Sequence, residues 1–129
     1  TFVVYDDAPS GCIVFEVANE RMAPHLHRGD FVIVDTDDSD PSSGELFLIQ
    51  WSTGAREIVD IREWLHGKPD ADQTWMACMT VPLASLAGGV EKMRWGDGPY
   101  PTWAIKEKLV GKVVGILEPD FRATLKRTA

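Results

Sequence analysis

The stretch FEVANERMAPHLHRGDFVIVD, residues 15–35, decides how this chain folds. It predicts a strand over residues 12–17, a shaped loop, and a second strand over residues 31–35 that is rich in β-branched and aromatic side chains. Pro24 in the loop disfavours helical backbone at the residue before it, and Gly29 can adopt the positive φ that a sharp reversal needs. The connection is therefore predicted to be a loop and not a helix.

Further strand-forming segments lie on both sides of this stretch. Alternating apolar and polar residues predict strands over residues 45–51 and 55–64, and segments rich in apolar residues predict further strands over residues 1–5, 75–81 and 111–117. Polar turns rich in Gly, Pro, Ser and Asp separate these segments. The expected fold class is therefore mainly β, with about seven to nine short and mostly antiparallel strands in a folded β-ribbon or partial barrel.

Composition limits the class of protein. The 129 residues, 44% of them hydrophobic, suffice for one core, so residues 1–129 are expected to form a single domain. The formal net charge of -7 argues against contact with nucleic acid by this chain itself, because phosphate binding needs a basic surface. Cys12 and Cys78 are predicted to be free thiols. There is no long apolar run and no signal-peptide pattern, so the expected location is cytoplasmic, without a membrane partner.

The loop carries a distinctive combination of residues. Met22 and Pro24 stand two apart, Gly29 and Asp30 follow, and a hydrophobic strand comes directly afterwards. In this order the pattern resembles the LexA-type repressor peptidases, whose C-terminal domain has a Ser-Met-x-Pro sequence followed by Gly-Asp. The resemblance implies a folded β-ribbon like that of the LexA C-terminal domain, and a homodimer. It also implies that Met22, Pro24, His25, Gly29 and Asp30 line a former substrate groove.

Both catalytic positions of that family are replaced here. Arg21 stands where the family has its serine nucleophile, and alignment of the hairpin over residues 45–64 puts Asp60, or next best Ile58, where the general-base lysine would lie. Such a dyad needs a desolvated lysine that takes the proton from the hydroxyl, and an arginine replaces neither member because it stays protonated. Arg21 is expected either to form an ion pair with Asp60 or to point into water.

Three functions from different classes follow. The first is a non-catalytic dimerisation and regulatory domain of a phage-type or bacterial transcriptional repressor, which contacts DNA only through an upstream helix-turn-helix domain outside this chain. The second is an active self-cleaving serine peptidase with a displaced nucleophile. The third is a β domain that binds a peptide or protein in the former groove by strand addition. The hydroxyls available for the second are Ser10, Ser42, Ser43 and Thr53.

Trp95, Tyr100 and Trp103 fall among Gly and Pro over residues 93–103, which predicts a rigid loop. These aromatics either pack against the core or form a partner surface. Residues 82–89 are read as a short helical turn or a loop. The strand near residues 109–117 and the basic tail at 121–129 are the candidate dimer surfaces.

Neither a metal site nor a cofactor is expected. His25 and His27 lie two apart on the loop and His66 lies far along the chain, without the Cys or carboxylate spacing that completes a metal site. These histidines are predicted to be surface or loop residues, although His25 and His27 could influence whatever the former groove binds.

Overall fold

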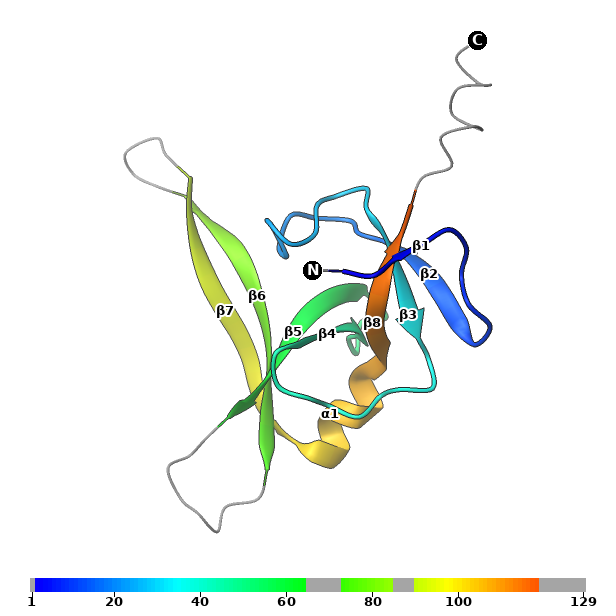
Figure 1. Ribbon diagram of the computed structural model, residues 1–129. Helices are drawn as coiled ribbons and strands as arrows, with labels where there is room; N and C mark the ends of the chain where they lie inside the picture. Colours follow the sequence, from blue (N-terminus) through cyan, green and yellow to red (C-terminus); the bar gives the residue numbers. More distant parts are fainter. Residues whose placement is uncertain (1, 65–72, 85–89, 119–129) are drawn as a thin grey trace.

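The computed structural model of the chain describes residues 2–64, 73–84 and 90–118. Within them, eight strands and one short helix follow one another along the chain (Figure 1). They are β1 (Val4–Tyr5), β2 (Cys12–Glu16), β3 (Phe31–Asp35), β4 (Glu45–Gln50), β5 (Arg56–Trp64), β6 (Thr74–Ala84), β7 (Val90–Pro101), α1 (Thr102–Lys108) and β8 (Leu109–Leu117). The predicted mainly-β fold is confirmed.

One curled sheet contains all the strands, in the order β2-β3-β8-β4-β5-β6-β7, with β1 added to β8. All neighbours are antiparallel except β1, which runs parallel to β8. β6 and β7 form a long two-stranded ribbon that extends away from the rest of the sheet, and the barrel does not close (Figure 1). β2 and β7 are therefore the outer strands of this order, and β1 also has a single strand neighbour.

The final strand, β8, lies in the interior of the sheet. β3 pairs with it on one side, and β4 and β1 pair with it on the other. β8 therefore has sheet neighbours on both sides, and the role of residues 109–117 as a dimer surface stays a prediction. The other candidate, the basic tail at 121–129, lies outside the described residues.

The core lies around β4 and β5. Phe47, Leu48 and Ile49 are successive residues that are all fully buried, so both faces of β4 are covered. Met22 and Leu26 of the loop between β2 and β3 are also buried and belong to the same cluster. The loop is thus packed against the sheet and does not simply extend into solvent.

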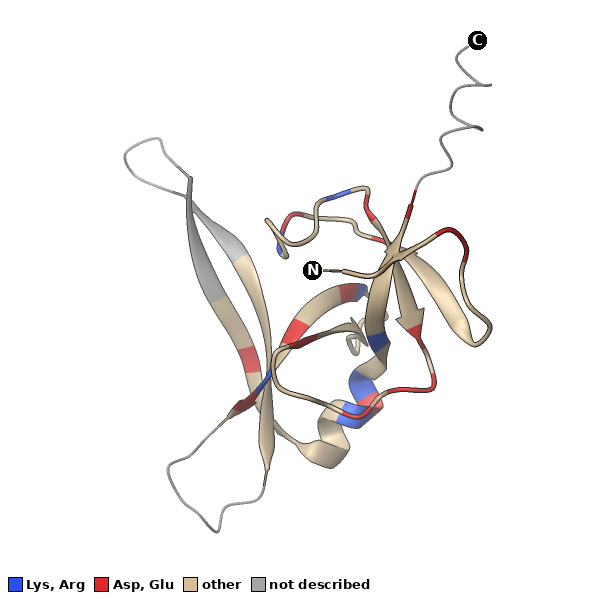
Figure 2. Cartoon of the chain, in the orientation of Figure 1, with Lys and Arg blue, Asp and Glu red and all other residues tan. Residues whose placement is uncertain are grey.

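Residues 93–103 are not the rigid loop that the sequence predicts. They belong to β7 and to α1, which starts directly after Pro101. β7 is an edge strand, where proline is tolerated because one side of the backbone needs no strand partner. α1 buries only Ile105 and places Lys106 and Lys108 in its last turn, where the helix dipole favours cations; basic residues are visible on this helix in Figure 2.

Parts of the remaining predictions fall outside the described residues. Residues 82–84 continue β6, whereas residues 85–89 and His66 are not described. In the described ranges, no helix is both long and apolar enough to cross a membrane.

Candidate functional site

The loop between β2 and β3 is closed by backbone hydrogen bonds. Val17 donates its N–H to the Asp30 carbonyl, and Gly29 donates to the Val17 carbonyl, each at 2.8 Å. Gly29 has a φ of 92°, so its predicted positive φ is confirmed. Asp30 accepts the His27 N–H at 2.8 Å through its carboxylate. The loop therefore has a defined shape that fixes the position of Arg21.

Arg21 is anchored through both its backbone and its side chain. Its carbonyl accepts the Thr80 N–H at 2.9 Å, which attaches the loop to β6. Its Nη1 lies 3.1 Å from Glu57 Oε1 and 3.5 Å from the sulfur of Met79. Glu57 is only 14% exposed and also accepts a hydrogen bond from Trp51 Nε1 at 2.8 Å. One carboxylate therefore links the loop to β5 and to the end of β4.

The prediction that Arg21 forms an ion pair with Asp60 is wrong. Asp60 instead accepts hydrogen bonds from Nε and Nη2 of Arg62 at 3.1 and 3.0 Å. Side chains alternate between the faces of a strand, so Asp60 and Arg62 share one face of β5 while Glu57 lies on the other. Arg21 reaches the Glu57 face. The alternative expectation, an Arg21 side chain free in water, is corrected by the same contact.

Two strand pairs separate near the loop, and each separation leaves a pocket. β5 and β6 pair only as far as Asp60 and Cys78, and this opening of about 250 Å³ is called the β5–β6 wedge. β4 and β8 pair only as far as Phe47 and Lys112, and this second opening of about 320 Å³ is called the β4–β8 wedge. Leu46 lines both wedges, and so do three other residues, His25, Asp60 and Arg62.

The predicted groove residues do not all face one cavity. Arg21, Met22, Pro24, His25 and Asp60 line the β5–β6 wedge together. Gly29 and Asp30 line a separate, more apolar pocket of about 340 Å³ beside Phe31 and Ile116. His25 reaches all three cavities. The groove expected from the resemblance is thus divided by the loop itself.

The hydroxyls considered for a displaced nucleophile lie in turns elsewhere. Ser43 Oγ accepts the Glu63 N–H at 3.2 Å, and Thr53 Oγ1 accepts the Ala55 N–H at 3.4 Å. None of the four candidates lines either wedge. The β5–β6 wedge does contain Cys78 and Thr80, neither of which was predicted to line the groove. The register of β6 against β5, which places Cys78 opposite Asp60, is the signal that could have assigned Cys78 to this site; it does not extend to Thr80.

The three aromatics proposed as a partner surface have different environments. Trp95 is 43% exposed and Trp103 is 68% exposed, so both can contact another molecule. Tyr100 is half-buried, its hydroxyl donates to the Asp97 carboxylate, and Lys108 Nζ lies 5.4 Å from its ring centroid. Tyr100 therefore joins β7 to α1 and is not an exposed contact residue.

Tyr100 gives a pH-dependent prediction. Burial raises the pKa of Tyr100 to about 12 from its ordinary value of 10.0, and the hydrogen bond to Asp97 and the charge of that carboxylate act in the same direction. Because the pKa is higher in the folded state, the stabilisation is complete below pH 10 and is lost as the pH rises towards 12. In Tyr5→Phe, Tyr100 is the remaining tyrosine, and its ultraviolet absorbance should titrate near pH 12. A midpoint near pH 10 would contradict this assignment.

Within the part of the chain that the structure describes, no three His, Cys, Asp or Glu side chains gather as a metal site would require. His27 Nδ1 lies 2.9 Å from Glu20 Oε2, and His25 lines the wedges without a metal-ligating neighbour pattern. Cys12 and Cys78 are free thiols; burial raises the pKa of Cys12, and Asp35 and Asp37 add to the shift.

No protein-family model, curated protein or solved structure matches this chain. Function must therefore be inferred from the residues of the site.

Proposed function

We propose that this chain is a non-catalytic, peptidase-like dimerisation and regulatory domain of a phage-type or bacterial transcriptional repressor. The observation that supports this best is the ion pair of Arg21 with Glu57, at the position where LexA-type peptidases have their nucleophile. A guanidinium stays protonated and has no lone pair to offer, so it can neither attack a peptide bond nor accept a proton. The loop keeps the residue pattern of that family and lacks its chemistry.

The acidic character of the chain supports a division of roles in such a repressor. With a net charge of -7, this domain is poorly suited to bind phosphates, so an upstream helix-turn-helix domain would contact DNA. Pairing of two copies would place two such domains on the half-sites of an operator. The backbone edges of β2 and β7 are the routes for strand pairing between copies.

The absence of self-cleavage is the first expected result. The gene product that contains this chain should keep its intact mass after incubation at alkaline pH, where a dyad lysine would be deprotonated and active. Mass spectrometry before and after incubation measures this directly. A discrete cut that disappears when one hydroxyl residue is changed would contradict the proposal and favour the self-cleaving peptidase.

Dimerisation is tested separately by sedimentation velocity over a range of protein concentrations. A reversible shift between monomer and dimer is expected, because the proposed repressor needs two copies to occupy two half-sites. A strictly monomeric protein would remove the dimerisation role even if its mass stayed unchanged.

A further inference from the structure

We propose that the pocket beside Phe31 binds a small organic cation, a molecule with an apolar body and one ammonium group. This pocket of about 340 Å³ is called the Phe31 pocket. The inference goes beyond the proposed regulatory function and does not rest on it. It is carried by the apolar walls of the pocket, by exposed apolar side chains at its mouth, and by carboxylates that have no cationic partner.

The walls and the mouth of the Phe31 pocket are apolar. Leu26 and Ile116 line it, and they are buried and half-buried. Val4 and Phe31 also line it but remain 53% and 42% exposed. Large apolar side chains that stay exposed around a cavity mark a place where another molecule can cover them. The volume is at the lower end of the range of ligand pockets, which suits a small occupant.

The backbone of β8 beside this pocket is already hydrogen-bonded within the chain. Ile116 donates its N–H to the Val3 carbonyl, and Glu118 donates to the Tyr5 carbonyl, each at 2.9 Å. On the other side of β8, Val32 of β3 is paired with Ile116. β8 therefore has no place here for an added strand, and a ligand in the pocket contacts side chains. This favours a small molecule over an extended peptide.

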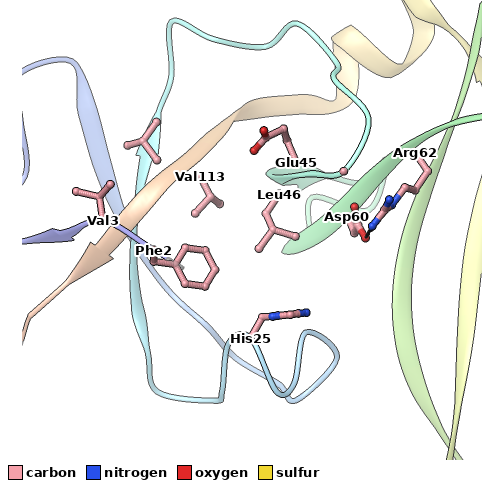
Figure 3. Close-up of a pocket in the computed structure, with 10 residues that line it drawn as sticks. Phe2, Val3, His25, Glu45, Leu46, Asp60, Arg62 and Val113 are labelled. Atoms are coloured by element: carbon pink, nitrogen blue, oxygen red, sulfur yellow. Dashed lines mark hydrogen bonds and ion pairs between the residues drawn. The ribbon is translucent and has the colours of Figure 1, made fainter.

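Two side chains form the wall between the Phe31 pocket and the β4–β8 wedge. Phe2 and His25 line both cavities, and Figure 3 shows the Phe2 ring between Val113 and His25. With Phe31, the Phe2 ring gives the pocket two aromatic side chains. The faces of aromatic rings attract cations, so this wall suits an ammonium group as well as an apolar body.

The carboxylates of the Phe31 pocket carry uncompensated charge. Asp30 and Glu118 line the pocket, and its described lining contains no lysine or arginine. The hydrogen bond that Asp30 accepts comes from the backbone N–H of His27, which carries no charge. Neither carboxylate forms an ion pair with any described residue. Arg28 lies close by in the loop but does not line the pocket. The complementary ligand is therefore a cation.

The first test is a titration of the 129-residue chain with phenethylamine, which has an aromatic ring and an ammonium group. We expect saturable binding with a Kd of about 1 mM or below, and shifts of the amide signals of Gly29, Phe31 and Leu117 in NMR spectra. Phenethyl alcohol, the uncharged analogue, should bind at least about threefold more weakly, and the anion hydrocinnamate more weakly still. Equal affinity for the amine and the alcohol, or no saturation up to about 10 mM amine, would overturn the proposal.

Substitutions that remove charge alone locate the ammonium group. Asp30→Asn and Glu118→Gln keep an acceptor oxygen and each remove one negative charge, so each should weaken phenethylamine binding by about two- to fivefold. Asp38→Asn is the matched control, because Asp38 also accepts a backbone N–H, from Asp40 at 3.3 Å, and does not line the pocket. If the control weakened binding as much as the other two variants, the overall charge of the chain would explain the affinity and the proposal would fail.

Two further comparisons identify the mouth and the occupant. Val4→Trp should obstruct the mouth and weaken binding by about fivefold or more, whereas Val14→Trp, at a 42% exposed position outside the lining, should bind as the unmodified chain does. Unchanged binding in Val4→Trp contradicts the proposal. Phe121→Ser combined with Leu125→Ser removes two apolar side chains from the segment that follows Glu118, and should leave the affinity unchanged. A rise of about tenfold would assign the pocket to that segment instead.

Discussion

Gly111→Ala is expected to lower the free energy of unfolding by about 3 kcal/mol or more. A Cβ on Gly111 would lie 2.8 Å from the carbonyl carbon of Asp35 and from Cγ1 of Val34, and closer still to the Asp35 carbonyl oxygen. The obstacle is largely backbone, which cannot move without separating β3 from β8. Because β8 joins the two halves of the sheet, relief of this clash would disturb every strand pairing around it.

The matched control for this prediction is Gly54→Ala. A Cβ there would meet nothing within 4 Å, although the φ of 89° adds strain of about 1 kcal/mol. Urea unfolding monitored by tryptophan fluorescence compares the two variants, and the melting temperature of Gly111→Ala should fall by about 10 °C or more. Equal losses in the two variants would mean that β3 and β8 can shift to admit a Cβ, and that close packing does not require glycine at position 111.

Glu57→Ala is expected to have the second large effect, lowering the free energy of unfolding by about 2 to 3 kcal/mol. The substitution leaves Trp51 Nε1 and Arg21 without their shared acceptor, and Glu57 is mostly shielded from water that could replace it. Glu57→Gln keeps an acceptor oxygen for Trp51, so its free energy of unfolding should fall by less than that of Glu57→Ala. Arg21→Ala should cost less than about 1 kcal/mol, because Arg21 is 42% exposed and partly exposed ion pairs contribute little.

Glu16→Ala is the control for removal of a glutamate from a strand. Glu16 is exposed on β2, so its loss should change stability by no more than about 0.5 kcal/mol. Denaturant unfolding of all four variants, the three at Glu57 and Arg21 and this control, gives the loss in free energy of unfolding for each and so ranks the contacts. If Glu57→Ala matched Glu16→Ala, the Arg21 and Trp51 contacts would not stabilise the fold, and the structural role assigned to Arg21 would have to be withdrawn.

The strands were largely predictable because their signal is local. β3 is a run of β-branched and aromatic residues, and β5 alternates apolar and charged side chains, so periodicity alone identifies both. β7 was missed because Gly96, Gly98 and Pro99 normally interrupt strands. Its pairing with β6, including the irregularity between Trp75 and Ala77, overrides that local preference. α1 was missed because it is short and buries a single residue, Ile105.

The candidate site was only partly predictable for a different reason. The closure of the loop depends on Gly29, which the sequence identifies directly. The partner of Arg21 depends on which face of β5 each acidic residue occupies, and an alignment that is uncertain by one residue reverses that face. Both wedges depend on where paired strands diverge, and sequence periodicity contains no information about divergence.

The interior position of β8 bears on the order in which a ribosome can complete this domain. Once residue 64 has been synthesised, all four strands of the β2–β3 and β4–β5 hairpins are present. The two hairpins do not pair with each other, because β8 lies between β3 and β4 in the sheet. They are joined only when residues 109–117 leave the exit tunnel and enter between β3 and β4. Such long-range pairing slows folding, so the facing edges of β3 and β4 stay open until β8 has been made and has entered between them.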